Sequence, residues 1–145
     1  MPALCRRLFQ LVLLTAFVLA AALPVRAEEP KYEPLPGEGK TCKIGSSDYS
    51  FVYKFDKKPQ LGVSILKLQV TDKAGGQVTA LKITGDSGMP SMRGHHDSGP
   101  VEFKLNKKGD YLLPVDVVMP GGWDVRLEFS KDGQVIYRGS INFDV

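Results

Sequence analysis

From Tyr49 onward, apolar and polar residues alternate along the chain with a period of two, and amphipathic helical spacing is not apparent. Alternation of this kind is typical of strands that have one buried face and one face in water. It is clearest in residues 123–130, where Trp, Val, Leu and Phe alternate with Asp, Arg, Glu and Ser, and in residues 137–144. The pattern predicts an all-β chain.

The same alternation predicts about seven strands. They are expected at residues 49–55, 63–71, 78–84, 101–105, 111–117, 123–130 and 137–143. In the fourth strand, Val101, Phe103 and Leu105 form the row that faces inward. Pro114 indicates an edge position or a bulge in the fifth strand, because proline cannot donate to a ladder. The phase is lost near Ile65 and Ala80, so the pattern alone does not give the registers of the second and third strands.

Turn-forming residues separate the strands at 72–76, 106–110 and 131–134, which are rich in Gly, Asp and Asn. About seven short strands in about a hundred residues predict an immunoglobulin-like antiparallel β-sandwich. A small barrel is the alternative. We expect the sandwich to span residues 48–145 as one domain, because a chain of this length supports one hydrophobic core.

Strand counting also predicts which loops share an end of the sandwich. The loop at 86–100 and the turn at 119–122 are separated by two strands, one in each direction, so they emerge at the same end. The turns at 72–77, 106–110 and 131–134 share the opposite end, and Cys42 is expected nearer to that end. Two Met-Pro pairs, which begin at Met89 and Met119, are therefore predicted to be neighbours.

The first 27 residues follow the order of a secretory signal peptide. Arg6 and Arg7 precede an apolar run of 16 residues, and Val25-Arg26-Ala27 matches a cleavage site. The run is shorter than the roughly 20 residues that a membrane-spanning helix needs. We therefore expect cleavage before Glu28, no membrane span afterwards, and a periplasmic or secreted protein. Residues 28–47 are rich in Pro and Gly and read as an extended N-terminal leader.

Removal of the signal also changes the charge of the chain. The whole chain has 19 Lys and Arg against 16 Asp and Glu, and the signal contains Arg6, Arg7 and Arg26 but no acidic residue. The mature chain is therefore balanced. Its composition indicates neither nucleic acid nor an acidic membrane surface as a partner.

One cysteine, Cys42, follows the signal. An odd cysteine in an oxidising compartment cannot form an internal disulfide. Four roles remain: a small buried apolar residue, a reactive thiol, a bond between chains, or a soft-metal ligand. Burial under a strand is the simplest of them.

The main candidate for chemistry is a Gly/Pro-rich loop that gathers two thioethers and two imidazoles. Thioether and imidazole together suit copper, in particular Cu(I). The candidate ligands are, in order, Met89, Met92 and His95, then His96 and Met119. Each also has a purely structural explanation, since a loop Met can cover the core, Met119 continues an inward row, and loop histidines are often solvated. Gly94 would permit the tight turn that two adjacent imidazoles need.

Other chemistries have less support. His95, His96 and Asp97 are acceptable zinc ligands, but neither an HExxH helix nor a Cys pair accompanies them. Residues 85–88, Gly-Asp-Ser-Gly, are similar to the nucleophile loop of chymotrypsin-like proteases, which need two barrels that a chain of this size cannot supply. We interpret the tetrad as a turn and do not expect an enzyme. Trp123 is expected in the core.

Several of these motifs occur in an order that resembles the YtkA-like domain family, which is related to FixH. They are Met89-Pro-Ser-Met92, the following His95, Gly109-Asp-Tyr111, Met119-Pro-Gly-Gly-Trp123 and the final Phe143-Asp-Val145. The resemblance covers about residues 60–145. It implies a secreted or membrane-anchored immunoglobulin-like sandwich. FixH relatives are associated with copper handling and assembly of cbb3-type cytochrome oxidase, and many YtkA-like proteins have no established activity.

Two hypotheses follow from the sequence. In the first, a periplasmic β-sandwich binds copper through the Met/His loop and acts as a carrier or accessory factor for an envelope or membrane protein. In the second, the chain is a metal-free interaction domain, and its strand edges or loops dock another envelope protein.

Overall fold

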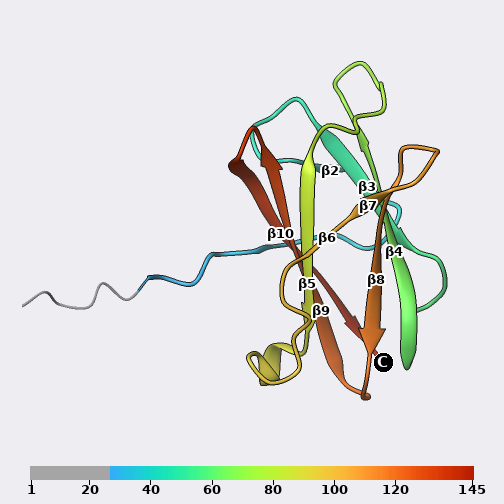
Figure 1. Ribbon diagram of the computed structural model, residues 1–145, viewed down its shortest axis with the longest axis vertical. Helices are drawn as coiled ribbons and strands as arrows, with labels where there is room; N and C mark the ends of the chain where they lie inside the picture. The colour runs from blue at the N-terminus through green and yellow to red at the C-terminus, as the bar shows by residue number, and fades with distance from the viewer. Residues whose placement is uncertain (1–26) are drawn as a thin grey trace, which may run out of the picture.

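The computed structural model describes residues 27–145, so the predicted signal peptide lies outside the described residues except for Ala27. The described chain contains ten strands in two five-stranded sheets that pack face to face (Figure 1). The predicted all-β sandwich is therefore confirmed. Its strand count is ten rather than about seven, because the leader adds two short strands and the fourth predicted strand is divided in two.

The strands are numbered in chain order. They are β1 (Glu33–Pro34), β2 (Cys42–Lys43), β3 (Ser50–Phe55), β4 (Gly62–Thr71), β5 (Lys82–Gly88), β6 (Val101–Glu102), β7 (Lys104–Leu105), β8 (Tyr111–Val117), β9 (Gly122–Lys131) and β10 (Gln134–Asp144), and a short 3₁₀ helix, η1 (Pro90–Met92), follows β5. The first sheet has the order β1-β10-β9-β5-β6, and the second has the order β2-β3-β4-β8-β7.

This strand order is that of an immunoglobulin domain. When β3, β4, β5, β7, β8, β9 and β10 are lettered A to G, the sheets read A-B-E-D and C-F-G. The strand pairs are antiparallel except for β1 and β10, which are parallel.

The core lies between the sheets and follows the predicted alternation in β8 and β9. The odd-numbered residues of both strands, from Tyr111 to Val117 and from Trp123 to Phe129, are buried. Phe51 of the second sheet packs on Phe129 of the first, with ring centroids 4.8 Å apart. Full burial of one such side chain stabilises the fold by about 1.5–3 kcal/mol, so these rows hold the two sheets together.

The third strand differs from its prediction. The prediction for 78–84 was wrong at both ends, and the turn interpretation of Gly-Asp-Ser-Gly was wrong as well, because β5 continues to Gly88 and pairs with β9 along its whole length. A Cβ atom on Gly85 would lie 2.5 Å from Cδ2 of Leu113. This glycine therefore does not form a turn, and its missing side chain lets the two sheets pack closely at this point.

The fourth predicted strand changes sheets at its centre. Residues 101–102 form β6 in the first sheet and residues 104–105 form β7 in the second. Phe103 is buried, whereas Val101 and Leu105 are exposed, so the predicted inward row was wrong at its two ends. The reason is that the chain crosses the open side of the sandwich at Phe103 and does not continue as one straight strand.

The Pro/Gly-rich leader is part of the sandwich. β1 pairs with β10, β2 pairs with β3, and Ile44 is fully buried. The hydroxyl of Tyr53 donates to the carbonyl oxygen of Pro36 at 2.6 Å. The sandwich therefore begins at Glu33, ahead of the expected boundary at residue 48, and prolines keep these first strands short.

Pro114 lies at an open edge, as its residue type predicted. β7 covers only Tyr111 and Leu112 of β8, so within residues 27–145 no strand lies beside Pro114 on this side of β8. Among residues 27–145, no helix is long and apolar enough to cross a membrane.

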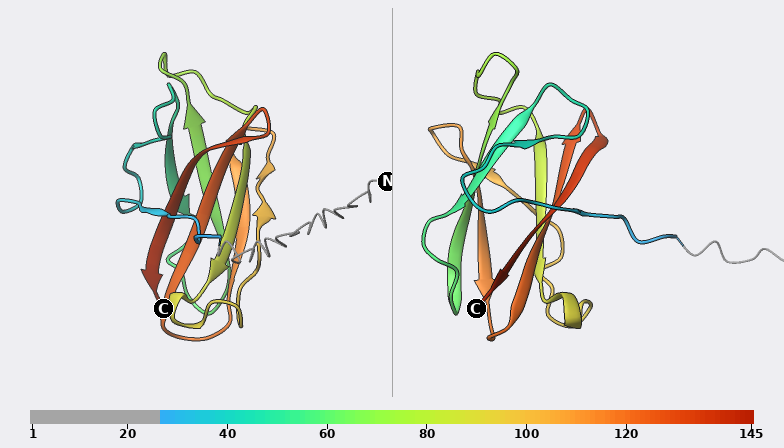
Figure 2. Two further views of the ribbon diagram at one scale, coloured as in Figure 1. Left: turned by 90° about the vertical axis from the view of Figure 1, so that its left-hand side faces the viewer. Right: turned by 180° about the vertical axis from the view of Figure 1, so that it is seen from behind.

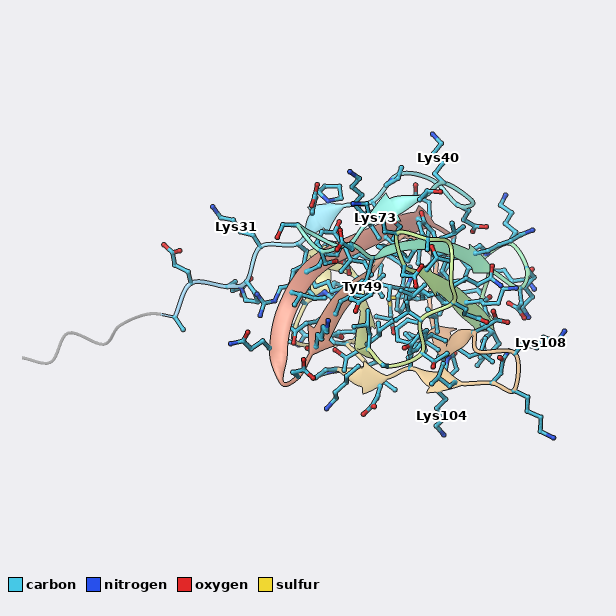
Figure 3. All side chains as sticks on the ribbon, turned by 90° about the horizontal axis from the view of Figure 1, so that it is seen from above. Lys31, Lys40, Tyr49, Lys73, Lys104 and Lys108 are labelled. Atoms are coloured by element: carbon cyan, nitrogen blue, oxygen red, sulfur yellow. The ribbon has the colours of Figure 1, made fainter. Side chains whose placement is uncertain are left out.

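The predicted distribution of loops between the two ends is also confirmed. Both views in Figure 2 show the loop after β5 and the turn between β8 and β9 at the same lower end. At the upper end, the Nζ atom of Lys131 donates to the hydroxyl of Tyr49 at 3.0 Å, and Gln77 packs on Gly109. Figure 3 looks down on the molecule from this end, and Lys40, Lys104 and Lys108 point outward at the rim of that view.

Candidate functional site

The candidate site is the lower end of the sandwich, formed by the loop after β5 and the turn between β8 and β9 (Figure 1). Pro90 begins η1, a position for which the restricted φ of proline is suited. The amide of Met92 donates to the carbonyl oxygen of Met89 at 2.9 Å, and the amide of His95 donates to that of Met92 at 3.1 Å. Gly94 has a φ of 91°, which favours glycine and lets the loop reverse.

Arg93 fastens this loop to the first sheet. One guanidinium nitrogen, Nη1, lies 3.1 Å from Oδ1 of Asp86 and 3.7 Å from Oδ1 of Asp97. The other, Nη2, donates to Oδ1 of Asp124 and to the backbone oxygen of Asp86. The Arg93 side chain is only 15% exposed and that of Asp124 only 6%. We call these four residues the arginine clamp.

Further contacts complete the clamp. Oδ2 of Asp124 lies 3.2 Å from Nε of Arg126, so this buried carboxylate has two cationic partners. Oδ2 of Asp97 accepts from the amide of Gly94 at 2.6 Å. The amide of Ser98 donates to the backbone oxygen of Ser87 at 2.8 Å. The loop is therefore held at its middle and at its return to β5.

The sequence analysis did not identify Arg93. The Arg93–Asp97 spacing was visible in the chain, but Asp86 and Asp124 lie far apart in sequence. They meet because β5 and β9 pair with Gly88 opposite Asp124 and Asp86 opposite Arg126. The sequence does show one arginine in a loop and acidic residues on the neighbouring strands. This combination indicates an ion-pair cluster only when the register of β5 against β9 is known.

The structure brings the two Met-Pro segments together. A Cβ atom on Gly121 would lie 2.8 Å from Cε of Met89, so the methyl group of Met89 rests on the β8–β9 turn. Met89 is buried in the core, whereas Met92 and Met119 are half-buried and pack against it. Nε1 of Trp123 donates to the backbone oxygen of Met119 at 3.0 Å and fixes the turn. Three thioethers thus belong to one end of the molecule.

The two histidines are both exposed, but only His96 lies beside the β8–β9 turn. His96 lines a hollow of about 340 Å³ together with Asp116, Val118 and Trp123, which places it beside the β8–β9 turn. His95 does not line this hollow. His96, the second candidate by sequence, is therefore the imidazole that the structure associates with the segment before Met119.

The lower end offers few ligands for a hard or borderline metal. Within residues 27–145, no three His, Cys, Asp or Glu side chains gather in a way that could hold a metal ion. The carboxylates of Asp86, Asp97 and Asp124 are engaged by arginine. The thioethers are soft ligands that suit Cu(I), and imidazole also binds copper. Asp116 adds a carboxylate beside His96.

Cys42 is separate from this set of donors. It is buried, and it pairs with Phe51 near the upper end, as predicted from the sequence. Its thiol lies 3.6 Å from the backbone oxygen of Lys40, to which it donates. Burial, with a smaller contribution from Glu33, raises the pKa of the thiol, which keeps it protonated and unreactive.

Comparison of the chain with protein-family models, curated proteins and solved structures finds no match. The resemblance to YtkA-like domains therefore rests on the motifs quoted from the sequence.

Proposed function

We propose that this chain is a periplasmic or secreted protein that binds copper, in particular Cu(I), at the lower end of the sandwich and carries it for an envelope or membrane partner. The observation that supports this most directly is the contact between the methyl group of Met89 and Gly121. It joins two Met-Pro segments that are 30 residues apart in the chain. The motifs that resemble the YtkA-like pattern include both segments.

The donors proposed for copper are Met89, Met92 and Met119, with His96 or His95 as the imidazole. Cu(I) accepts thioether and imidazole ligands. Met92 and Met119 are half-buried at the surface, and the imidazoles are exposed. The arginine clamp holds the loop that carries all but one of these donors, so the apo protein would present them without first having to order the loop.

A Cu(I) competition titration under reducing conditions tests the proposal. We expect one-to-one binding, which is lost when Met92→Leu is combined with replacement of the ligand histidine by glutamine. His95→Gln and His96→Gln, made separately, identify that imidazole. Met→Leu conserves volume, so the metal-free melting temperature should stay almost unchanged.

Cys42→Ser is the matched control, because Cys42 lies near the opposite end, and it should bind copper as the parent does. Binding no tighter than that of an unstructured Met/His peptide would contradict the proposal. Unfolding of the metal-free Met92→Leu variant would instead indicate that the thioether is a packing residue.

A metal-free interaction domain is the second candidate, and one observation favours it. Met89 is part of the hydrophobic core, and Met92 and Met119 pack against it, which is what structural residues do. In that case the titration shows no specific copper binding, and the exposed faces of the sandwich become the surfaces of interest.

A further inference from the structure

The hollow beside the β8–β9 turn is lined by an imidazole and two carboxylates, those of His96, Asp97 and Asp116. An imidazole with two carboxylates is a set of ligands that suits a divalent metal such as zinc, whereas thioethers suit Cu(I). Within residues 27–145, however, no three such side chains are placed so that they could hold a metal ion. The lower end thus contains the ligand types for a divalent metal but does not gather them.

Asp97 follows directly after His96 in the chain, but the loop itself engages both of its carboxylate oxygens. Oδ1 lies 3.7 Å from Nη1 of Arg93, and Oδ2 accepts from the amide of Gly94 at 2.6 Å. The side chain of Asp97 is only 21% exposed. A metal ion that used this carboxylate would have to replace contacts with a cation and with a backbone amide, and such charge-assisted contacts are the stronger ones.

Arg93 is held in place by the first sheet. Its Nη2 atom donates to Oδ1 of Asp124, which is only 6% exposed, and its Nη1 atom lies 3.1 Å from Oδ1 of Asp86. A planar guanidinium group has five donors and can contact several carboxylates at once. Two of its carboxylates come from strands, and the third, Asp97, comes from the loop. The arginine clamp therefore ties Asp97 to the sheet.

Gly88, the last residue of β5, makes room for this contact. A Cβ atom at this position would lie 2.5 Å from Oδ1 of Asp97 and 2.9 Å from Nη1 of Arg93. Both distances are too short for a carbon atom, so any side chain here would displace at least one of the two groups. The missing side chain of Gly88 and the charge of Arg93 therefore both keep Asp97 in the clamp.

We propose that the arginine clamp makes the lower end selective for Cu(I), because it withholds the carboxylate of Asp97 from divalent metals. Arg93 and Gly88 are then positioning residues that do not contact the metal. With Asp97 in the clamp, the hollow retains His96 and Asp116, and two ligands are fewer than the three that an open zinc site uses. Release of Asp97 supplies the third. The inference rests on the proposed copper site, whose selectivity it explains.

Competition for Zn²⁺ between the purified protein and a chromophoric chelator tests the proposal. Arg93→Met and Gly88→Ala should each bind Zn²⁺ at least about tenfold more tightly than the parent, because each releases Asp97. A residue that only stabilised the fold would not raise a metal affinity when it is replaced. Gly88→Ala leaves Arg93 with Asp124 as its buried partner, so this variant should be folded by circular dichroism even where Arg93→Met is not.

Two controls show whether the gain comes from Asp97. Added to either variant, Asp97→Asn should return the Zn²⁺ affinity to that of the parent. Arg138→Met removes an arginine from an ion pair with Glu128 on the outer face of the same sheet, and it should leave the Zn²⁺ affinity unchanged.

Three results would overturn the proposal: a folded Gly88→Ala variant with the Zn²⁺ affinity of the parent, a gain that persists after Asp97→Asn, or an equal gain in Arg138→Met. These measurements use no copper, so they are independent of the Cu(I) titration. A parent that binds no Cu(I) would contradict the proposed function, whereas a parent that binds Cu(I) together with variants that gain no Zn²⁺ affinity would contradict only the role of the clamp.

Discussion

Replacement of Arg93 by methionine removes the cation on which three carboxylates converge, while the side chain keeps a similar length. Asp124, only 6% exposed, would retain Nε of Arg126 at 3.2 Å as a cationic partner. Asp86 and Asp97 are 27% and 21% exposed, so water compensates part of their charge. Removal of one partner from a fully buried pair costs about 3–5 kcal/mol. With these two compensations, we expect Arg93→Met to lower the free energy of unfolding by about 2–3 kcal/mol.

Urea denaturation followed by circular dichroism measures this change. The midpoint should fall without a change in slope, because the surface exposed on unfolding is the same. Arg93→Lys should be intermediate, since lysine keeps the charge but cannot contact several carboxylates with one planar group. Hydrogen exchange should show faster exchange of the Gly94 and His95 amides, whose acceptors in the loop are held by the clamp.

Arg138→Met is the control for the clamp. Arg138 pairs with Glu128 on the outer face of the same sheet, but these side chains are 36% and 33% exposed. An ion pair with that exposure contributes less than about 1 kcal/mol. Equal losses of stability in the two methionine variants would refute the view that burial of Asp124 makes the clamp a stabilising element.

Two further predictions concern packing and pH. Gly85→Ala should lower the free energy of unfolding by about 1–3 kcal/mol, because the new Cβ atom would lie 2.5 Å from Cδ2 of Leu113. Gly37→Ala is the control: its Cβ atom meets no atom within 4 Å, so the urea midpoint should stay almost unchanged. Asp110 has a pKa below its usual 3.8, chiefly because Gln69 donates to its carboxylate. A lowered pKa means that this carboxylate stabilises the fold above about pH 4 and that the contribution is lost as the pH falls through the folded-state pKa. The stability difference between the parent and Gln69→Leu should therefore shrink on acidification below pH 4, and a difference independent of pH would exclude this explanation.

The strands that the alternation predicted well are those whose faces have uniform surroundings along their length. β8 and β9 pack one face on the core and leave the other outside, so their sequence carries the period of two directly. β5 was misplaced because Gly, Asp and Ser have local preferences for turns. At Gly85 that preference is overridden by Leu113 of the facing sheet, a residue that local pattern cannot associate with it.

The candidate site, like the strands, could be predicted from the sequence only in part. That the two Met-Pro segments lie at one end followed from counting strand directions, and the structure agrees. The depth of each methionine and the side on which each histidine lies depend on the reversal at Gly94 and on the contacts of Arg93. Those contacts join residues from a loop and two strands, so no local segment contains the information.

The sequence by itself therefore determined the all-β class, the sandwich and the residue types at its lower end, because hydrophobic alternation and turn chemistry act over a few neighbouring residues. Only the tertiary structure decided the strand boundaries at β5, the crossing at Phe103 and the arginine clamp. Each of these arises where side chains distant in sequence meet, and there close packing and the pairing of buried charges outweigh local preference.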